Sequence, residues 1–245
     1  MGKHTQTGFT VIEVMLFLAV TGLLAIGILV GSGVAIGQQR YRDSVNSLKS
    51  FIQDQYSAVT NVDNGRSKGW TCDTASVITE VTNGQPRGTS DCVLIGRLIT
   101  VDDTGTKLTA SNIAAYRTPG ATPIPSDISE IATNYRMSIS PIDQTVQDVA
   151  WGAQIVQQKT TTPLPLSILI IRSPLSGSLF TFTAEGITSN PNELVTVANT
   201  SQPRNLCVNA DIGSFVGRRL EVRIDAYATN QGGVLVPPES ESVCD

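Results

Sequence analysis

Few side chains in this chain have the types and spacing that catalysis or metal binding requires. The only histidine is His4, in a short polar segment at the N-terminus. Serine and cysteine hydrolases use an imidazole as general base. Because we expect this segment to be absent from the mature protein, we expect neither such catalysis nor a bound cofactor.

Two groups of carboxylates offer oxygen ligands. Asp102 and Asp103 precede Thr104-Gly105, but the spacing of an EF-hand calcium loop is missing, so this segment predicts a hairpin turn. Glu221 and Asp225 are expected on the solvated face of one strand. We therefore expect no metal site.

Trp70 and Trp151 could be adhesive surface aromatics, although packing in the domain is the favoured role.

The chain has four cysteines, and none is part of the C-x-x-C spacing that zinc sites use, so a role as zinc ligands is not favoured. Disulfides formed outside the cytoplasm are the favoured interpretation, and three pairings are open. Pairing of chain neighbours is preferred, Cys72 with Cys92 and Cys207 with Cys244. Each bond would then close a loop of a few tens of residues.

The one acidic side chain within the N-terminal apolar stretch is Glu13. Residues 9–37 are otherwise uncharged and exceed the roughly 20 apolar residues that a helix needs to cross a bilayer. Lys3 lies before the stretch and predicts a cytoplasmic N-terminus, although Arg40 and Arg42 on the other side weaken the asymmetry. The sequence therefore predicts a single-pass membrane anchor.

A carboxylate within hydrocarbon needs a partner of opposite charge. If the chain is cut between Gly8 and Phe9, the new amine of Phe9 lies four residues before Glu13. The same amine on an adjacent subunit could neutralise Glu13. The carboxylate would then set the register between subunits.

The segment Gly8-Phe9-Thr10-Val11-Ile12-Glu13 resembles the prepilin peptidase signature of type IV pilins and type II secretion pseudopilins. The resemblance implies cleavage after Gly8, N-methylation of Phe9 and packing of the apolar helices into a filament core. Gly22 also falls where such pilins often have a glycine. Where many have a helix-melting proline, this chain has Val30, which departs from the pattern.

A basic cluster near the C-terminus raises a separate hypothesis. Residues 205–224 faintly resemble the C-terminal part of H-type minor pseudopilins and DNA-uptake minor pilins, some of which use a glycine-arginine motif on the DNA backbone. The candidate contacts here are Arg218, Arg219 and Arg223, but Leu220 stands where a second spaced arginine would be. With a net charge of -4 there is no global attraction to phosphates, so we expect weak DNA binding at most.

The spacing of apolar residues along the sequence predicts the helices and strands that position these residues. Residues 41, 45, 48, 52, 55 and 59 continue the anchor as an amphipathic helix, so one helix is expected from about Phe9 to about Thr60. The fold class expected is α+β, the long helix packing on a C-terminal antiparallel β-sheet domain, as in the pilin fold. Strands are predicted at residues 76–81, 92–101, 108–115, 135–139, 166–172, 178–184, 193–197, 206–210 and 219–229.

The resulting organisation has four parts: a leader at residues 1–8, a transmembrane and filament-core helix at 9–38, its amphipathic continuation at 39–60, and an extracellular domain at 61–245.

The function expected is a structural subunit of a type IV pilus, displaying a domain for adhesion or motility. Alternatives are a minor pilin or H-type pseudopilin of a type II secretion or DNA-uptake machine, and a membrane-anchored binding domain that never polymerises. Expected partners are further copies in a helical filament, prepilin peptidase, the assembly platform, other pilins, the membrane and a surface or host-cell ligand. The precursor is expected in the cytoplasmic membrane and the assembled subunit at the cell surface.

Overall fold

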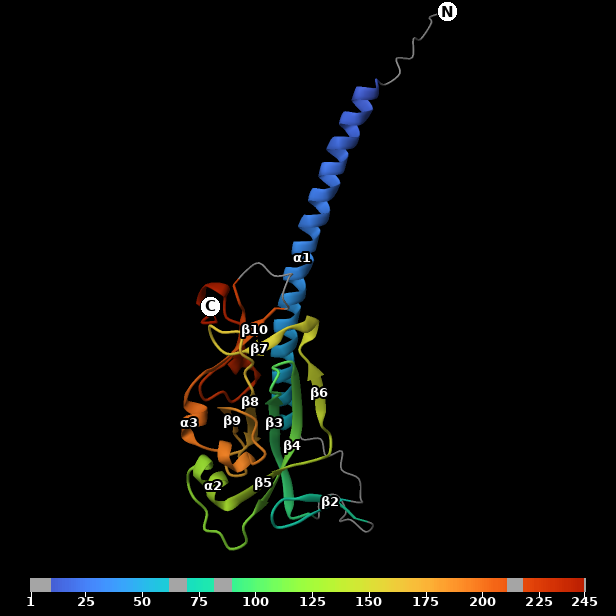
Figure 1. Ribbon diagram of the computed structural model, residues 1–245. Coiled ribbons are helices and arrows are strands. Elements are labelled where there is room, and N and C mark those ends of the chain that lie inside the picture. The colour runs from blue at the N-terminus through green and yellow to red at the C-terminus, as the bar shows by residue number, and fades with distance from the viewer. Residues whose placement is uncertain (1–9, 62–69, 82–89, 211–217, 245) are drawn as a thin grey trace, which may run out of the picture.

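The computed structural model describes residues 10–61, 70–81, 90–210 and 218–244. A single helix, α1 (Val11–Thr60), extends from the remainder of the chain as a rod (Figure 1). Its C-terminal half packs against strands, whereas its N-terminal half projects away from them. The long N-terminal helix and the C-terminal antiparallel β-sheet domain confirm the predicted α+β class.

The largest sheet has the strand order β5-β4-β3-β8-β9, with β6 also pairing with β4. All of these pairs are antiparallel. The strands are β3 (Cys92–Val101), β4 (Lys107–Arg117), β5 (Tyr135–Ile139), β6 (Thr145–Asp148), β8 (Leu166–Arg172) and β9 (Leu179–Glu185).

A second sheet has the order β12-β11-β10-β7, and a two-stranded ribbon pairs β1 with β2. These pairs are antiparallel as well. Their bounds are β1 (Trp70–Cys72), β2 (Ile78–Glu80), β7 (Gln154–Val156), β10 (Arg204–Asn209), β11 (Glu221–Ile224) and β12 (Val234–Leu235).

Short helices fill the connections. They are α2 (Asp127–Asn134), α3 (Val197–Ser201) and the 3-10 turns η1 (Ala150–Gly152), η2 (Pro191–Leu194), η3 (Gln231–Gly233) and η4 (Glu239–Glu241). The strand predicted at residues 193–197 is therefore wrong. Pro191 starts η2, and the side chain of Thr196 caps α3, so these residues form two helical turns instead.

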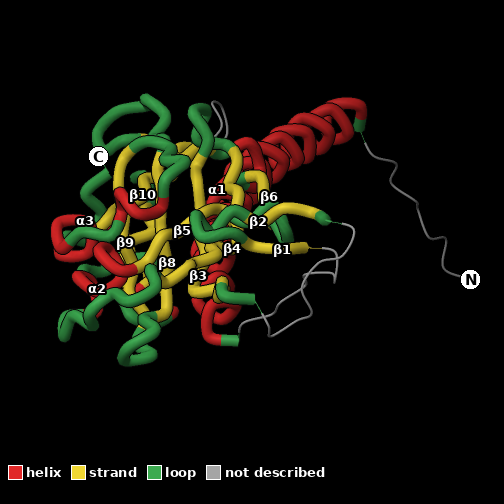
Figure 2. Tube along the Cα trace, turned by 90° about the horizontal axis from the view of Figure 1, so that it is seen from below, coloured by secondary structure: helices red, strands yellow, loops and turns green. Residues whose placement is uncertain are grey.

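The six-stranded sheet is buried on both faces, which explains the nearly continuous apolar sequence of β8. Leu166, Ile168 and Ile170 of β8 point into a core that α1 shares with the four-stranded sheet. Leu169 and Ile171 point into a second core with residues of α2 and η2. Figure 2 accordingly shows α2 and α3 on the opposite side of the strands from α1.

The amphipathic half of α1 provides most of its contacts with the domain. Six residues at most 4% exposed recur every three to four positions, as one helical face requires: Tyr41, Val45, Leu48, Ile52, Gln55 and Val59. The stripe predicted from sequence is thus the buried face of the helix.

One irregularity in the sheet depends on glycine. The register of β3 against β4 shifts between Leu94 and Gly96, as in a β-bulge. A Cβ atom at Gly96 would collide with the backbone carbonyl oxygen of Ile170 on the neighbouring strand. The close approach of β3 and β8 therefore requires glycine here.

Candidate assembly helix and its junction with the domain

The N-terminus of α1 is closed by a reciprocal pair of hydrogen bonds, the capping box. The backbone N–H of Glu13 donates to Thr10 Oγ1 over 3.3 Å, and the backbone N–H of Thr10 donates to Glu13 Oε2 over 3.3 Å. The Glu13 carboxylate also lies at the end of the helix where the macrodipole favours negative charge. Within one chain, therefore, Glu13 already has a structural role.

This carboxylate has no cationic partner among the residues that the structure describes. Its polar contacts there are those with Thr10 in the capping box. The free-energy cost of a carboxylate that is hydrogen-bonded but has no opposite charge nearby is small in water and large in hydrocarbon. An apolar environment for this end of α1 would therefore require a cation from elsewhere.

The projecting half of α1 is an uncovered apolar surface. Between residues 10 and 36 every described side chain except that of Thr21 is exposed. Thr21 turns its hydroxyl back onto the Phe17 carbonyl, 2.8 Å away, so it adds no free polar group. Among the described residues, α1 is the one helix long and apolar enough to cross a membrane.

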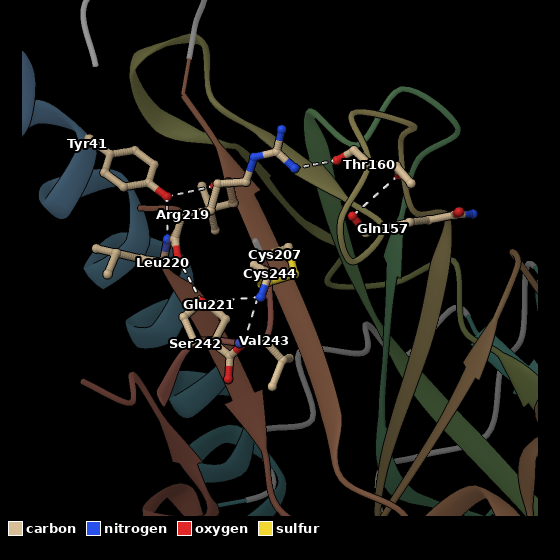
Figure 3. Close-up of a disulfide and its surroundings, with 11 residues drawn as sticks. Tyr41, Gln157, Thr160, Cys207, Arg219, Leu220, Glu221, Ser242, Val243 and Cys244 are labelled. Carbon is tan, nitrogen blue, oxygen red and sulfur yellow. Dashed lines mark hydrogen bonds between the residues drawn. A yellow bond between two sulfur atoms is a disulfide. The ribbon is translucent and has the colours of Figure 1, made fainter. Parts of the chain in front are cut away.

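The exposed surface ends where Tyr41 enters the domain. The Tyr41 hydroxyl donates to the Val208 carbonyl over 2.7 Å and accepts from the Leu220 N–H over 2.6 Å. Val208 lies on β10, and Leu220 directly precedes β11. Figure 3 shows the ring reaching from α1 toward Leu220. One side chain, 3% exposed, thus joins α1 to β10 and to the residue that precedes β11 in the four-stranded sheet.

The two neighbours of Tyr41 on α1 contact other elements. The Arg40 guanidinium lies over the Trp151 ring, 4.9 Å from its centroid, and Arg42 forms a 3.4 Å ion pair with Glu239 of η4. The ion pair is solvent-exposed, so it contributes little stability. Trp151, for which packing was the favoured role, is 57% exposed. Three consecutive helix residues thus contact three separate parts of the domain.

Beside this junction lies the disulfide between Cys207 and Cys244 (Figure 3). Its Cα atoms are 5.5 Å apart, and both residues are fully buried. The bond fastens the C-terminal segment to β10, whose next residue, Val208, accepts the Tyr41 hydrogen bond. The junction is therefore supported covalently.

Glu221 lies against the same disulfide. Its carboxylate accepts from the Val243 N–H over 3.1 Å and approaches the Cys244 sulfur to 3.3 Å. At 1% exposure it contradicts the expectation of a solvated strand face. Although Cys207, Glu221 and Cys244 bring three ligand atoms within 4.8 Å, both sulfurs belong to the disulfide and offer no thiolate to a metal.

The second disulfide joins Cys72 to Cys92, with Cα atoms 6.1 Å apart. It links the β1–β2 ribbon to the first residue of β3. Both cysteines are only half-buried. The structure thus pairs neighbouring cysteines along the chain, the pairing preferred from sequence.

The candidate DNA-contacting arginines include two that form contacts within the domain. Arg219 donates to the Thr160 carbonyl over 2.6 Å, as Figure 3 shows, and Arg223 forms a 3.0 Å ion pair with Asp225. Arg218 is exposed. The guanidinium groups of Arg219 and Arg223 are therefore already engaged within the domain.

The Asp102 segment forms the turn between β3 and β4. Its Oδ1 atom accepts from the backbone N–H groups of Thr106 and Lys107, and its Oδ2 atom accepts from the Thr104 hydroxyl. Gly105 takes φ of +68° and closes the turn with a bond to the Asp102 carbonyl. The hairpin prediction is confirmed, and both carboxylate oxygens serve the turn.

Several predicted sites fall outside the described residues. The leader, the cleavage site at Gly8 and Phe9, and the N-methylation of Phe9 belong to this group. Conversely, sequence reasoning assigned Tyr41 to the buried stripe but missed its hydrogen bonds. The available signal was a tyrosine at the point where the apolar stretch gives way to Gln38-Gln39-Arg40, because a buried tyrosine hydroxyl normally finds a polar partner.

Comparisons of the chain with known protein families, with curated proteins and with solved structures find no match.

Proposed function

We propose that this protein is a type IV pilin-like subunit, held in a membrane by α1 as a precursor and polymerised through the same helix into a surface filament. The observation that carries the proposal is the division of a 50-residue helix into a packed half and an uncovered apolar half. The arrangement of one long helix against an antiparallel sheet is also what a pilin fold requires.

The uncovered half needs an apolar environment. Side chains such as Ile12, Leu23 and Leu29 are more than 70% exposed. The five consecutive apolar residues 14–18 are all exposed, so the exposed surface extends around the helix rather than along one stripe. An apolar surface of this extent on a soluble monomer leads to association or membrane insertion. A bilayer satisfies it in the precursor, and neighbouring copies of α1 satisfy it in a filament.

Glu13 supplies specificity within this apolar surface. In the proposed mechanism, prepilin peptidase cuts after Gly8, and the amine of Phe9 on one subunit neutralises Glu13 on another. Since the carboxylate has no cationic partner among the described residues of its own chain, this pairing would offset its desolvation on assembly. The domain is then displayed outward for adhesion or motility.

The capping box allows the charge of Glu13 to be tested separately from its role at the helix end. Glu13→Gln keeps an oxygen that can accept from the Thr10 N–H but removes the charge. Thr10→Ala removes the hydroxyl that accepts from the Glu13 N–H and keeps the charge of Glu13. We expect Glu13→Gln and Glu13→Ala to remain in the membrane fraction yet form at most about a tenth of the wild-type filament, whereas Thr10→Ala should still assemble.

Filament yield is measured on surface-sheared material by electron microscopy and immunoblotting, with alkaline extraction as the control for membrane insertion. Mass analysis of the sheared subunit reports whether it begins at methylated Phe9. Wild-type filament yield from Glu13→Gln would refute the charge mechanism. Sheared subunits that still contain residues 1–8 would refute the pilin proposal itself. Continuous fibres labelled along their length would identify a major subunit, and sparse or tip labelling a minor one.

A further inference from the structure

We propose that Trp151 lies in the headgroup layer of the bilayer that α1 spans, so that the precursor domain rests on the membrane surface through the η1 turn. This inference rests on the proposed membrane-spanning state of α1. It identifies an interaction surface on the domain itself, and the occupant is the phospholipid interface.

The first observation is the exposure of Trp151. Its indole is 57% exposed, although Val149 and Ala153 on either side of the turn are buried. The backbone of Trp151 has φ of 59° and ψ of 30°, a left-handed conformation that bulky residues rarely adopt. The buried flanks fix the turn and leave the large aromatic side chain outside the core.

The second observation is the position of Trp151 along α1. Residues 11–36 span about 40 Å as a helix, which covers the roughly 30 Å hydrocarbon layer and reaches the headgroups. Arg40 follows about one turn beyond the last exposed apolar residues of α1. Because the Arg40 guanidinium lies 4.9 Å from the centroid of the Trp151 ring, the indole is held at this same level.

The chemistry of this pair suits an interface. Tryptophan is enriched where membrane meets water, because its ring is apolar and its N–H is polar. Arg40 adds positive charge at the level of the lipid phosphates, whereas the charge of Arg42 is balanced by Glu239. Exposed Ile36 lies one helical turn before Arg40 and provides an apolar neighbour on the side of the acyl chains.

The chain contains two tryptophans, which makes the inference directly measurable. In Trp70→Phe the only tryptophan left is Trp151, and in Trp151→Phe it is Trp70. Trp70 belongs to β1, whose partner β2 lies at the end of the domain away from the projecting helix (Figure 1). Trp70 therefore serves as the reference far from the membrane.

The full-length chain would be reconstituted into phosphatidylcholine–phosphatidylglycerol vesicles whose acyl chains carry bromine either near the headgroup or near the methyl end. We expect shallow bromines to quench Trp151 about twofold more strongly than deep bromines, and neither to quench Trp70. A third variant, Leu24→Trp with both natural tryptophans replaced by Phe, reports whether α1 itself is inserted.

The outcomes separate this inference from the function on which it rests. Shallow quenching of Trp151 together with deep quenching of Leu24→Trp supports it. An unquenched Trp151 with a quenched Leu24→Trp overturns the docking surface and leaves the membrane anchor standing. An unquenched Leu24→Trp overturns both.

Discussion

The backbone N–H of Leu220 donates a 2.6 Å hydrogen bond to the hydroxyl of Tyr41, a residue 179 positions earlier in the chain. The same hydroxyl donates to Val208, so the rod and the smaller sheet share one buried polar atom. Tyr41 is one of several polar contacts between α1 and the domain, together with Gln53 and Tyr56, and it helps to fix how the helix is oriented against the strands.

Tyr41→Phe should destabilise the domain by about 1–3 kcal/mol, because the buried Leu220 N–H and Val208 carbonyl both lose this partner. Chemical denaturation of the full chain in detergent would measure the loss. The matched control is Tyr227→Phe, since Tyr227 is 57% exposed and its replacement should stay within about 0.5 kcal/mol. Equal effects of the two variants would show that the Tyr41 hydroxyl contributes nothing.

Tyr56 predicts a loss of stability at high pH. Burial raises its pKa to about 12, partly offset by the hydrogen bond with Thr181. Because the folded pKa lies above the unfolded value of about 10, the stabilisation is complete below pH 10 and is lost as pH rises through 12. A shift of two units corresponds to about 2.7 kcal/mol.

This loss would be measured as the fall in unfolding free energy between pH 9 and pH 12, about 2–3 kcal/mol larger in wild type than in Tyr56→Phe. Tyr227→Phe again serves as the control and should follow the wild-type curve. An unchanged pH dependence in Tyr56→Phe would exclude Tyr56 as its source.

Glu130 predicts the opposite behaviour in acid. Its pKa is lowered by the hydrogen bond from the Ile124 N–H, by Asn134 and by Arg117, against the opposing effect of burial. A lowered pKa means that the stabilisation is present above the unfolded value, about 4.3, and is lost as pH falls through the folded pKa. Glu130→Gln should therefore lose less stability than wild type between pH 7 and pH 3.

Denaturation midpoints at the two pH values provide this comparison. Glu241→Gln, at an exposed residue of η4, should retain the wild-type acid sensitivity. If Glu130→Gln is as acid-sensitive as wild type, the hydrogen bonds around Glu130 do not lower its pKa in solution.

The two disulfides should differ in their resistance to reduction. Cys207 and Cys244 are fully buried beside the Glu221 carboxylate, which repels an attacking thiolate, whereas Cys72 and Cys92 are half-buried. Peptide mapping after brief exposure to a thiol should find the Cys72–Cys92 bond opened first. Glu221→Gln should accelerate opening of the Cys207–Cys244 bond. Opening of the buried bond first in wild type would contradict this order.

Replacing either cysteine pair by serine should also reduce stability. The loops span 20 residues for Cys72–Cys92 and 37 residues for Cys207–Cys244, so the simple chain-entropy estimate is about 3 and about 4 kcal/mol. Denaturation of the two double variants measures the difference. A smaller loss for the Cys207–Cys244 pair would show that strain in the folded protein offsets its entropic advantage.

The sequence predicted most reliably those elements whose period is unambiguous. The three-to-four spacing of the stripe that contains Tyr41, Leu48 and Ile52 fits only a helix. The apolar sequence of β8 fits a strand that is buried on both faces. Helix α2 was missed because its eight residues are too short for a periodic signal, although Ser126 caps it. The error at residues 193–197 has a similar origin, since Pro191 and Thr196 start separate turns.

The junction was harder to predict than the elements that form it. Arg40 and Trp151 are 111 positions apart and meet only because η1 turns back toward α1. The sequence pattern places Glu221 on a solvent-exposed strand face, but the C-terminal segment held by Cys244 covers it. Such contacts depend on which loop covers which strand, and local sequence pattern does not encode that.

A single side chain joining α1 to β10, next to a covalent link from β10 to the C-terminal segment, has a mechanical consequence. Tension applied to α1 would pass through Tyr41 to β10 and, through the disulfide, to the C-terminal segment, which loss of hydrogen bonds alone cannot detach from β10. A pull on the helix would therefore leave β10 and the C-terminal segment joined.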